Sequence, residues 1–272
     1  MATSETVLQP YSVKAHNYAT AHANRIHEDT VAASFGFKGG LVTGIALYAY
    51  LVHPIVAEWG SAFFDSSDVR VRFLQPVYDQ EQLTAAPRKP GSDTIEVNLE
   101  GPDGAVRAVA SYTKSLGPEP PDIIEFPFEP LTERSNLTEA RIANLKPGTT
   151  LGSLEWTNDP SELEAGFLRD MREDLSIFRG PEGIIHPAYL LAQANEILMR
   201  NTILGPWIHT GSDIRHFGLP TRKSRLSLRG KIADSFERKG HELVSLDLAL
   251  IEDQKRVLAS IKHTAIIHLR AS

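Results

Sequence analysis

The sequence predicts an α+β protein made of two copies of one unit, each an antiparallel sheet wrapped around a long central helix. Three observations predict this fold: an apolar helix-like segment followed by strand-like segments, a proline-rich break, and a second helix followed by more strand-like segments. A helix that is apolar on nearly all sides needs cover on nearly all sides, and a curved sheet supplies it.

Composition limits the class of protein. The chain has 272 residues, of which 42% are apolar and 23% charged, as is typical of a globular protein with two ordinary domains. A net charge of -6 argues against a nucleic-acid partner, because phosphate binding needs clustered Lys and Arg. With no cysteine, the chain has neither a disulfide framework nor a thiol nucleophile.

Neither a membrane nor a secretory address is expected. The most apolar segment, residues 41–60, is interrupted by polar residues and falls short of the roughly 20 clean apolar residues of a membrane span. The N-terminal residues lack the basic start and apolar core of a signal peptide. We therefore predict a cytoplasmic protein with no membrane partner.

The first unit starts at that apolar segment, which we predict to be a buried helix over residues 41–58. Alternating polar and apolar residues then predict strands. These strand-like segments are residues 68–77, 81–87, 93–101 and 105–116.

The second unit follows a proline-rich stretch. A helix is predicted over residues 186–201, since Pro187 occupies a helix-start position and strong helix formers follow it. Strand-like segments then cover residues 212–220, 224–232, 241–253 and 256–269. We therefore divide the chain into an N-terminal domain (1–118), a proline-rich linker (119–150) and a C-terminal domain (151–272).

Short matches between the halves support a duplication. Residues 67–70 (SDVR) match residues 212–215 (SDIR), and both runs continue through a Phe to a Pro. Residues 109–111 (VAS) match residues 258–260 (LAS). A repeat of this length indicates a duplicated domain, so the two copies are expected to pair as a pseudo-dimer.

One loop concentrates residues suited to chemistry. The run HANRIHED (22–29) places His22, Asn24 and His27 close together, upstream of the glycine-rich KGGLVTG (38–44). The spacing lacks the i, i+4 histidine pair of a zinc enzyme, so we expect no metal and no cofactor. An imidazole titrates near neutral pH, which suits His27 to proton transfer.

These residues carry a family resemblance. NRIHED, GGLVTG and VRFLQPV (71–77) together resemble the MaoC-like (R)-specific enoyl-CoA hydratases and dehydratases of the hot-dog superfamily. Asn24 and His27 fall on the Asn and His of the family motif, and Gly44 falls on its helix-opening Gly. The resemblance covers residues 12–115. In the second half, IIHPAYLLAQ (184–193) is similar to a segment of polyketide dehydratases, with Leu191 in place of the catalytic Asp.

The resemblance implies a tandem (double) hot-dog fold and a lyase activity. The expected reaction hydrates an enoyl thioester or dehydrates a 3-hydroxyacyl thioester, with His27 as acid and base. The expected partner is a small-molecule acyl substrate, a coenzyme A thioester. A homo-oligomer such as a dimer is also compatible with the resemblance. Two departures stand out: the catalytic Asp of the family is His22 here, and the His before its helix-opening Gly is Thr43.

Each candidate residue also has a possible role outside catalysis. His22 can accept a proton from water as a neutral imidazole, or it can orient the substrate or the loop. Asn24 either contacts substrate or holds the loop through its amide. Gly44 at the helix start can hold an oxyanion with its N–H, with Thr43, Gly40 and Gly39 as further substrate-binding candidates or as turn residues.

The second half lacks a matching loop, because no histidine occurs between residues 150 and 185. His186 and His209 are therefore expected to be core or pocket-lining residues. The missing family carboxylate leaves alternatives open: an isomerase, another lyase acting on a non-thioester carbonyl compound, or a ligand-binding protein without catalysis.

Overall fold

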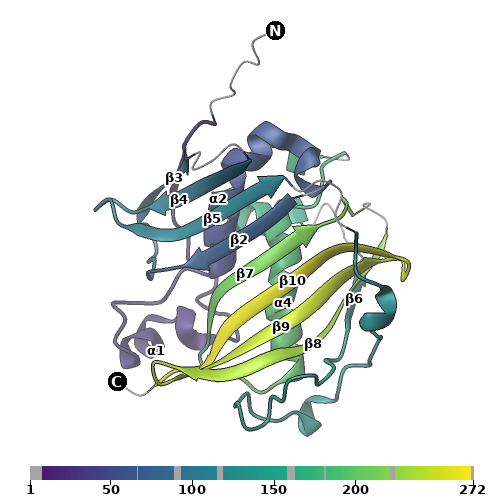
Figure 1. Ribbon diagram of the computed structural model, residues 1–272. Coiled ribbons are helices and arrows are strands. Elements are labelled where there is room, and N and C mark those ends of the chain that lie inside the picture. Colours follow the sequence, from purple (N-terminus) through teal and green to yellow (C-terminus); the bar gives the residue numbers. More distant parts are fainter. Residues whose placement is uncertain are drawn as a thin grey trace.

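The computed structural model describes residues 8–65, 67–88, 93–114, 119–157, 163–180, 182–220 and 224–270. Its main feature is one ten-stranded sheet in the order β1-β3-β4-β5-β2-β7-β10-β9-β8-β6 (Figure 1). Every neighbouring pair of strands is antiparallel. The first five strands in this order come from the N-terminal half and the last five from the C-terminal half.

The strands of the N-terminal half are β1 (Tyr11–Lys14), β2 (Ser67–Phe73), β3 (Gln82–Arg88), β4 (Thr94–Glu100) and β5 (Val106–Lys114). Those of the C-terminal half are β6 (Leu154–Thr157), β7 (Ile208–His216), β8 (Arg225–Arg238), β9 (His241–Glu252) and β10 (Arg256–His268). Within the described residues, the α-helices include α1 (Asp29–Ser34), α2 (Gly44–Trp59) and α4 (Pro187–Asn201).

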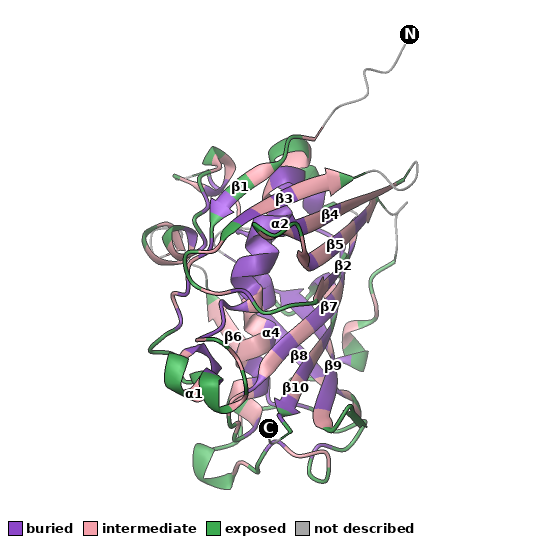
Figure 2. Ribbon diagram, turned by 90° about the vertical axis from the view of Figure 1, so that its left-hand side faces the viewer, coloured by how far each residue is buried: buried purple, intermediate pink, exposed green. Residues whose placement is uncertain are grey.

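The two long helices lie together on one side of the sheet, one for each half (Figures 1 and 2). The interior of α2 is buried from Ile45 to Val52 and again from Pro54 to Val56, which confirms the predicted helix with cover on nearly all sides. It begins at Gly44 because the Thr43 side chain caps it by accepting from the N–H of Ala46 at 3.1 Å. Pro187 opens α4, as predicted.

The sequence repeat marks the place where the halves meet. Strands β2 and β7 pair so that Asp68 lies opposite Arg215 and Arg70 lies opposite Asp213. Each aspartate forms an ion pair with the facing arginine, at 2.7 Å for Arg215–Asp68 and 3.2 Å for Arg70–Asp213. Equivalent residues of the two copies therefore meet around a pseudo-twofold axis, and the predicted α+β fold with two helix-and-sheet units is confirmed.

Two strands at the edges of the sheet were absent from the sequence prediction. Strands β1 and β6 are only 4 residues long each, too short for a visible alternation. The linker also packs on the molecule: Phe126 is buried against Ala249, Ile251 and Val257 on the C-terminal half. Among the described residues, no helix has the length and apolar character needed to cross a membrane.

Candidate active site

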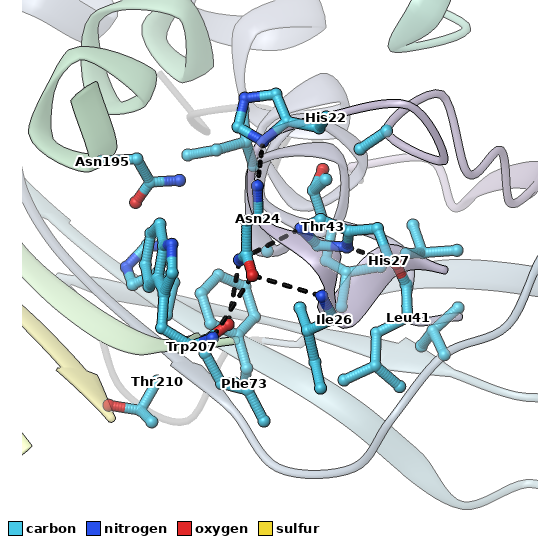
Figure 3. A pocket seen from close by; sticks show the side chains of 18 of the residues that line it. His22, Asn24, Ile26, His27, Leu41, Thr43, Phe73, Asn195, Trp207 and Thr210 are labelled. Atoms are coloured by element: carbon cyan, nitrogen blue, oxygen red, sulfur yellow. Dashed lines mark hydrogen bonds between the residues drawn. The ribbon is translucent and has the colours of Figure 1, made fainter. Parts of the chain in front are cut away.

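A cavity of about 490 Å³ lies where the predicted loop meets the second half of the chain. Its walls come from the segment between β1 and α2, the first turns of α2, the end of β2, one face of α4, and the start of β7. His22, Asn24, His27, Thr43 and Gly44 all line it, so the fold brings these five predicted residues together (Figure 3).

His27 is held as a neutral imidazole that lines the cavity. Its Nδ1 lies 2.6 Å from the carbonyl oxygen of Leu41, which can only accept, so Nδ1 carries the proton and Nε2 keeps its lone pair. Burial lowers the pKa of His27, and the nearby His22 lowers it further, against the opposing effect of the bond to Leu41. The imidazole is therefore neutral at pH 7, with Nε2 able to take a proton.

His22 presents the opposite nitrogen chemistry. Its Nδ1 accepts a hydrogen bond from the backbone N–H of Asn24 at 3.1 Å. A neutral His22 then carries its proton on Nε2, and this atom can only donate. The rings of His22 and His27 meet edge to face with centroids 6.4 Å apart. The geometry favours the orienting role for His22 over the role of a base.

Asn24 fastens the loop to the other half of the chain. Its Nδ2 donates to the carbonyl oxygen of Trp207 at 2.9 Å, and its Oδ1 accepts from the N–H of Trp207 at 3.2 Å (Figure 3). The same Oδ1 also accepts from the N–H of Ile26 at 3.3 Å. With both ends of the amide in use, Asn24 positions the loop, and its Nδ2 lies 3.5 Å from His27 Nε2.

The start of α2 brings N–H groups of a first helical turn to the cavity that His27 also lines. The N–H groups of Gly44 and Ile45 belong to the first helical turn, where no intrahelical acceptor exists, and both residues line the cavity. Such N–H groups suit an oxyanion. A Cβ at Gly44 would come within 2.9 Å of Phe73 and 3.2 Å of His209 Nδ1, so packing also requires glycine there.

Two predicted substrate-binding residues lie elsewhere. Gly39 and Gly40 are not among the residues that line the cavity. A Cβ at Gly40 would lie 2.1 Å from the carbonyl oxygen of His27, and the N–H of Gly40 donates to Asp29 at 2.8 Å. Glycine is needed at Gly40 because the chain passes close behind His27, so its role is to support the loop.

The second half adds residues that sequence reasoning did not assign to the site. Asn195 of α4, Trp207 and Thr210 line the side of the cavity away from His27 and Leu41 (Figure 3). His209 lines it as well, as the sequence allowed. Contacts between the two halves bring these residues to the cavity, and no local sequence pattern predicts that position.

His209 belongs to a buried chain of hydrogen bonds. Its Nε2 lies 2.9 Å from the hydroxyl of Ser212, which lies 3.0 Å from Nδ1 of His263. Burial lowers the pKa of both histidines, to about 3 for His263, and the neighbouring His263 lowers that of His209 further. Both rings are therefore neutral.

At the start of α4, which corresponds to the start of α2, the described side chains pack on one another. Glu173 accepts from His53 at 2.9 Å and lies 3.2 Å from Nε2 of His186, which caps α4. The rings of Phe167 and Phe178 pack on His186. His186 is thus a core residue, which is one of the two positions that the sequence predicts for it. Among the described residues, the group with donor atoms close enough for a metal ion is here, at His53, Glu173 and Asp174, outside the cavity.

Comparison with known proteins identifies the fold. No model of a known protein family and no curated protein matches the chain in sequence. A structure from Chloroflexus aurantiacus, provisionally named a MaoC domain dehydratase, superposes with a TM-score of 0.63 at 10% identity, covering 97% of this chain and 96% of that one.

Two further structures resemble it over nearly their whole length. A conserved hypothetical protein from Mycobacterium tuberculosis with a double hot-dog fold gives a TM-score of 0.60 at 12% identity, with 96% of each chain covered. A protein from Lactobacillus plantarum, provisionally named an oleoyl thioesterase, gives 0.56 at 10% identity, covering 97% of this chain and 98% of that one. At such low identity the likeness shows the fold alone, and this chain has the double hot-dog fold that MaoC-like dehydratases share.

Proposed function

We propose that the protein hydrates enoyl thioesters, or dehydrates 3-hydroxyacyl thioesters, with His27 carrying both proton transfers. The observation that carries this proposal is the bond between His27 Nδ1 and the carbonyl of Leu41. It leaves Nε2 as a base inside a cavity that also contains the start of α2.

In the hydration direction, His27 Nε2 takes a proton from water as the water oxygen bonds to the β-carbon. The electrons of the double bond move to the thioester oxygen, where the N–H groups of Gly44 and Ile45 would hold the negative charge. Protonated His27 then returns the proton to the α-carbon, so one water is added and the base is restored. His22 would orient the water or the thioester through its Nε2–H.

Hydrolysis of the thioester is the second candidate, because the same base and N–H groups suit attack of water on the carbonyl carbon. At least two of the structural neighbours bear thioesterase names. The two reactions differ in their products: hydration gives a 3-hydroxyacyl thioester, whereas hydrolysis releases a free thiol.

The test is to incubate the protein with a trans-2-enoyl coenzyme A and identify products by mass spectrometry, with a thiol reagent as a parallel readout. We expect a gain of one water, and a loss of turnover on the order of a hundredfold or more in His27→Ala, because a general acid/base is removed. His268→Ala is the matched control, since this exposed histidine lies outside the cavity.

Three results would contradict the proposal. Full turnover in His27→Ala would mean that another group transfers the proton. Thiol release without hydration would favour the thioesterase. Inertness toward every enoyl and hydroxyacyl thioester would leave the isomerase, the lyase of a non-thioester carbonyl compound, or the binding protein.

A further inference from the structure

The wall of the cavity contributed by the C-terminal half carries polar atoms without partners. Within the part of the chain that the structure describes, Trp207 Nε1, His209 Nδ1 and Asn195 Oδ1 are buried and make no hydrogen bond. Trp207 is 3% exposed and His209 is 6% exposed. All three residues line the cavity, so these unpaired atoms belong to the side chains of its wall.

The three atoms divide between two places. His209 Nδ1 lies beside Gly44, at the start of α2 where the thioester oxygen would be held. Asn195 comes from α4, and Asn195 and Trp207 occupy the side of the cavity away from His27 (Figure 3). The side chains of Trp207 and Asn195 are therefore placed to meet the acyl chain beyond the reacting carbons.

A plain alkyl chain fits this wall poorly. It would cover the indole N–H of Trp207 and the amide oxygen of Asn195 without offering either a hydrogen bond. Leaving a buried polar group unpaired costs free energy, and a site built to hydrogen-bond a ligand rejects the analogue that lacks the matching group.

The charge of the cavity wall further limits which polar group the acyl chain can carry. Among the described residues that line the cavity there is no Lys or Arg, and Glu196 is the one acidic side chain. His209 adds no positive charge, because burial keeps it neutral. A carboxylate on the acyl chain would be buried without a cation, which is costly. A hydroxyl suits the wall better, since it accepts from Trp207 Nε1 and donates to Asn195 Oδ1.

We propose that the acyl group of the substrate bears a neutral hydroxyl beyond the reacting carbons, bound by Trp207 and Asn195. This inference rests on the proposed function, because it assumes that the acyl chain of a thioester occupies the cavity.

The experiment compares kcat/KM for 2-hexenoyl coenzyme A with that for its 4-, 5- and 6-hydroxy derivatives. At least one hydroxylated substrate should be preferred by about tenfold or more, the effect of pairing buried groups that an alkyl chain leaves unpaired. The same comparison by calorimetry, with hexanoyl, hydroxyhexanoyl and 5-carboxypentanoyl coenzyme A, needs no turnover. The hydroxylated ligand should bind best and the carboxylated one worst.

Variants then locate the effect. Trp207→Phe and Asn195→Leu should each reduce the preference for the hydroxylated ligand about fivefold or more, because each removes one hydrogen-bonding atom and keeps most of the volume. Two variants on different elements guard against one that fails to fold. Trp59→Phe is the matched control: Trp59 lies outside the cavity, under Lys114.

The outcomes separate the two proposals. Hydration of all substrates at equal rates, with equal binding, would overturn the hydroxyl inference and leave the hydratase proposal intact. So would preference for the carboxylated ligand, or an unchanged preference in both variants. If no thioester is turned over and the hydroxylated ligand still binds best, the proposed function fails and the chemistry of the wall stands.

Discussion

The different roles that we propose for His22 and His27 rest on one hydrogen bond at each ring. The carbonyl of Leu41 takes the Nδ1 proton of His27, whereas the N–H of Asn24 occupies Nδ1 of His22. One ring therefore exposes a lone pair and the other exposes a donor. Sequence spacing places the two histidines in one loop, but it does not contain the partner of either ring.

Asn24 provides a test at the scale of one residue. In Asn24→Ala, the buried N–H and carbonyl of Trp207 lose their partner and the turn before α1 loses its cap. We expect the free energy of unfolding to fall by about 2 kcal/mol or more, the cost of leaving such groups unpaired. Turnover per folded molecule should fall too, because the loop that carries His27 loses its anchor.

Denaturant unfolding and kcat, measured on the same preparations, check this prediction. Asn144→Ala is the control, because Asn144 is exposed and its side chain donates to the nearby backbone carbonyl of Glu139. Lost turnover with unchanged stability would show instead that Asn24 contacts substrate and does not hold the loop.

The site could be predicted only in part from the sequence. The motif predicted a common site for five residues that do line one cavity, and their roles stay predictions. They are His22, Asn24, His27, Thr43 and Gly44. Trp207 and Asn195 were missed because they reach the cavity through contacts between the halves, and such long-range contacts leave no local pattern.

At the scale of elements, periodicity and capping carried the prediction. Both long helices and the eight central strands were predicted, since each has a clear apolar pattern. The helix predicted from residue 41 begins at Gly44, because Thr43 accepts the N–H of Ala46 and ends the extended chain. Strands β1 and β6 escaped prediction because what defines them is their pairing with β3 and β8.

Glu173 joins elements and gives a second test. Burial would raise the pKa of its carboxyl, but hydrogen bonds from His186 and His53 outweigh burial and hold that pKa well below its usual range. Glu173→Gln removes the charge between α2 and the cap of α4, and we expect a loss on the order of 3 kcal/mol of unfolding free energy at pH 7. Turnover of the folded fraction should persist, since Glu173 lies outside the cavity.

The pH dependence has a definite sign. A carboxyl whose pKa is lower in the folded state stabilises the fold at pH values above its pKa in the unfolded chain, about 4.3. This stabilisation is lost as the pH falls toward the pKa of the folded state. Unfolding measured at several pH values should therefore show the parent and Glu173→Gln converging on acidification below that point. A constant difference, or loss of turnover at pH 7 in the folded variant, would contradict this structural role.

At the scale of the molecule, we propose that two similar units have different functions. One continuous sheet and the paired repeats at β2 and β7 preserve the symmetry of the duplication. The first unit has a cavity with a histidine loop, whereas at the start of α4 Glu173 pairs with two histidines and two phenylalanines pack on His186. The second half contributes the wall of the cavity, and we assign the chemistry to the first.

The most direct test of this account is the pH dependence of kcat/KM for enoyl thioester hydration, in the parent and in His22→Gln. His27 must be neutral to act, and its pKa is lowered by burial and by His22. The parent should show a single acid limb, with activity falling only below the ordinary histidine value of about 6.5. In His22→Gln the limb should persist and move slightly to higher pH, because the charge of His22 no longer opposes protonation of His27. Disappearance of the limb in His22→Gln, with activity as low as in His27→Ala, would show that His22 is the base and contradict the account.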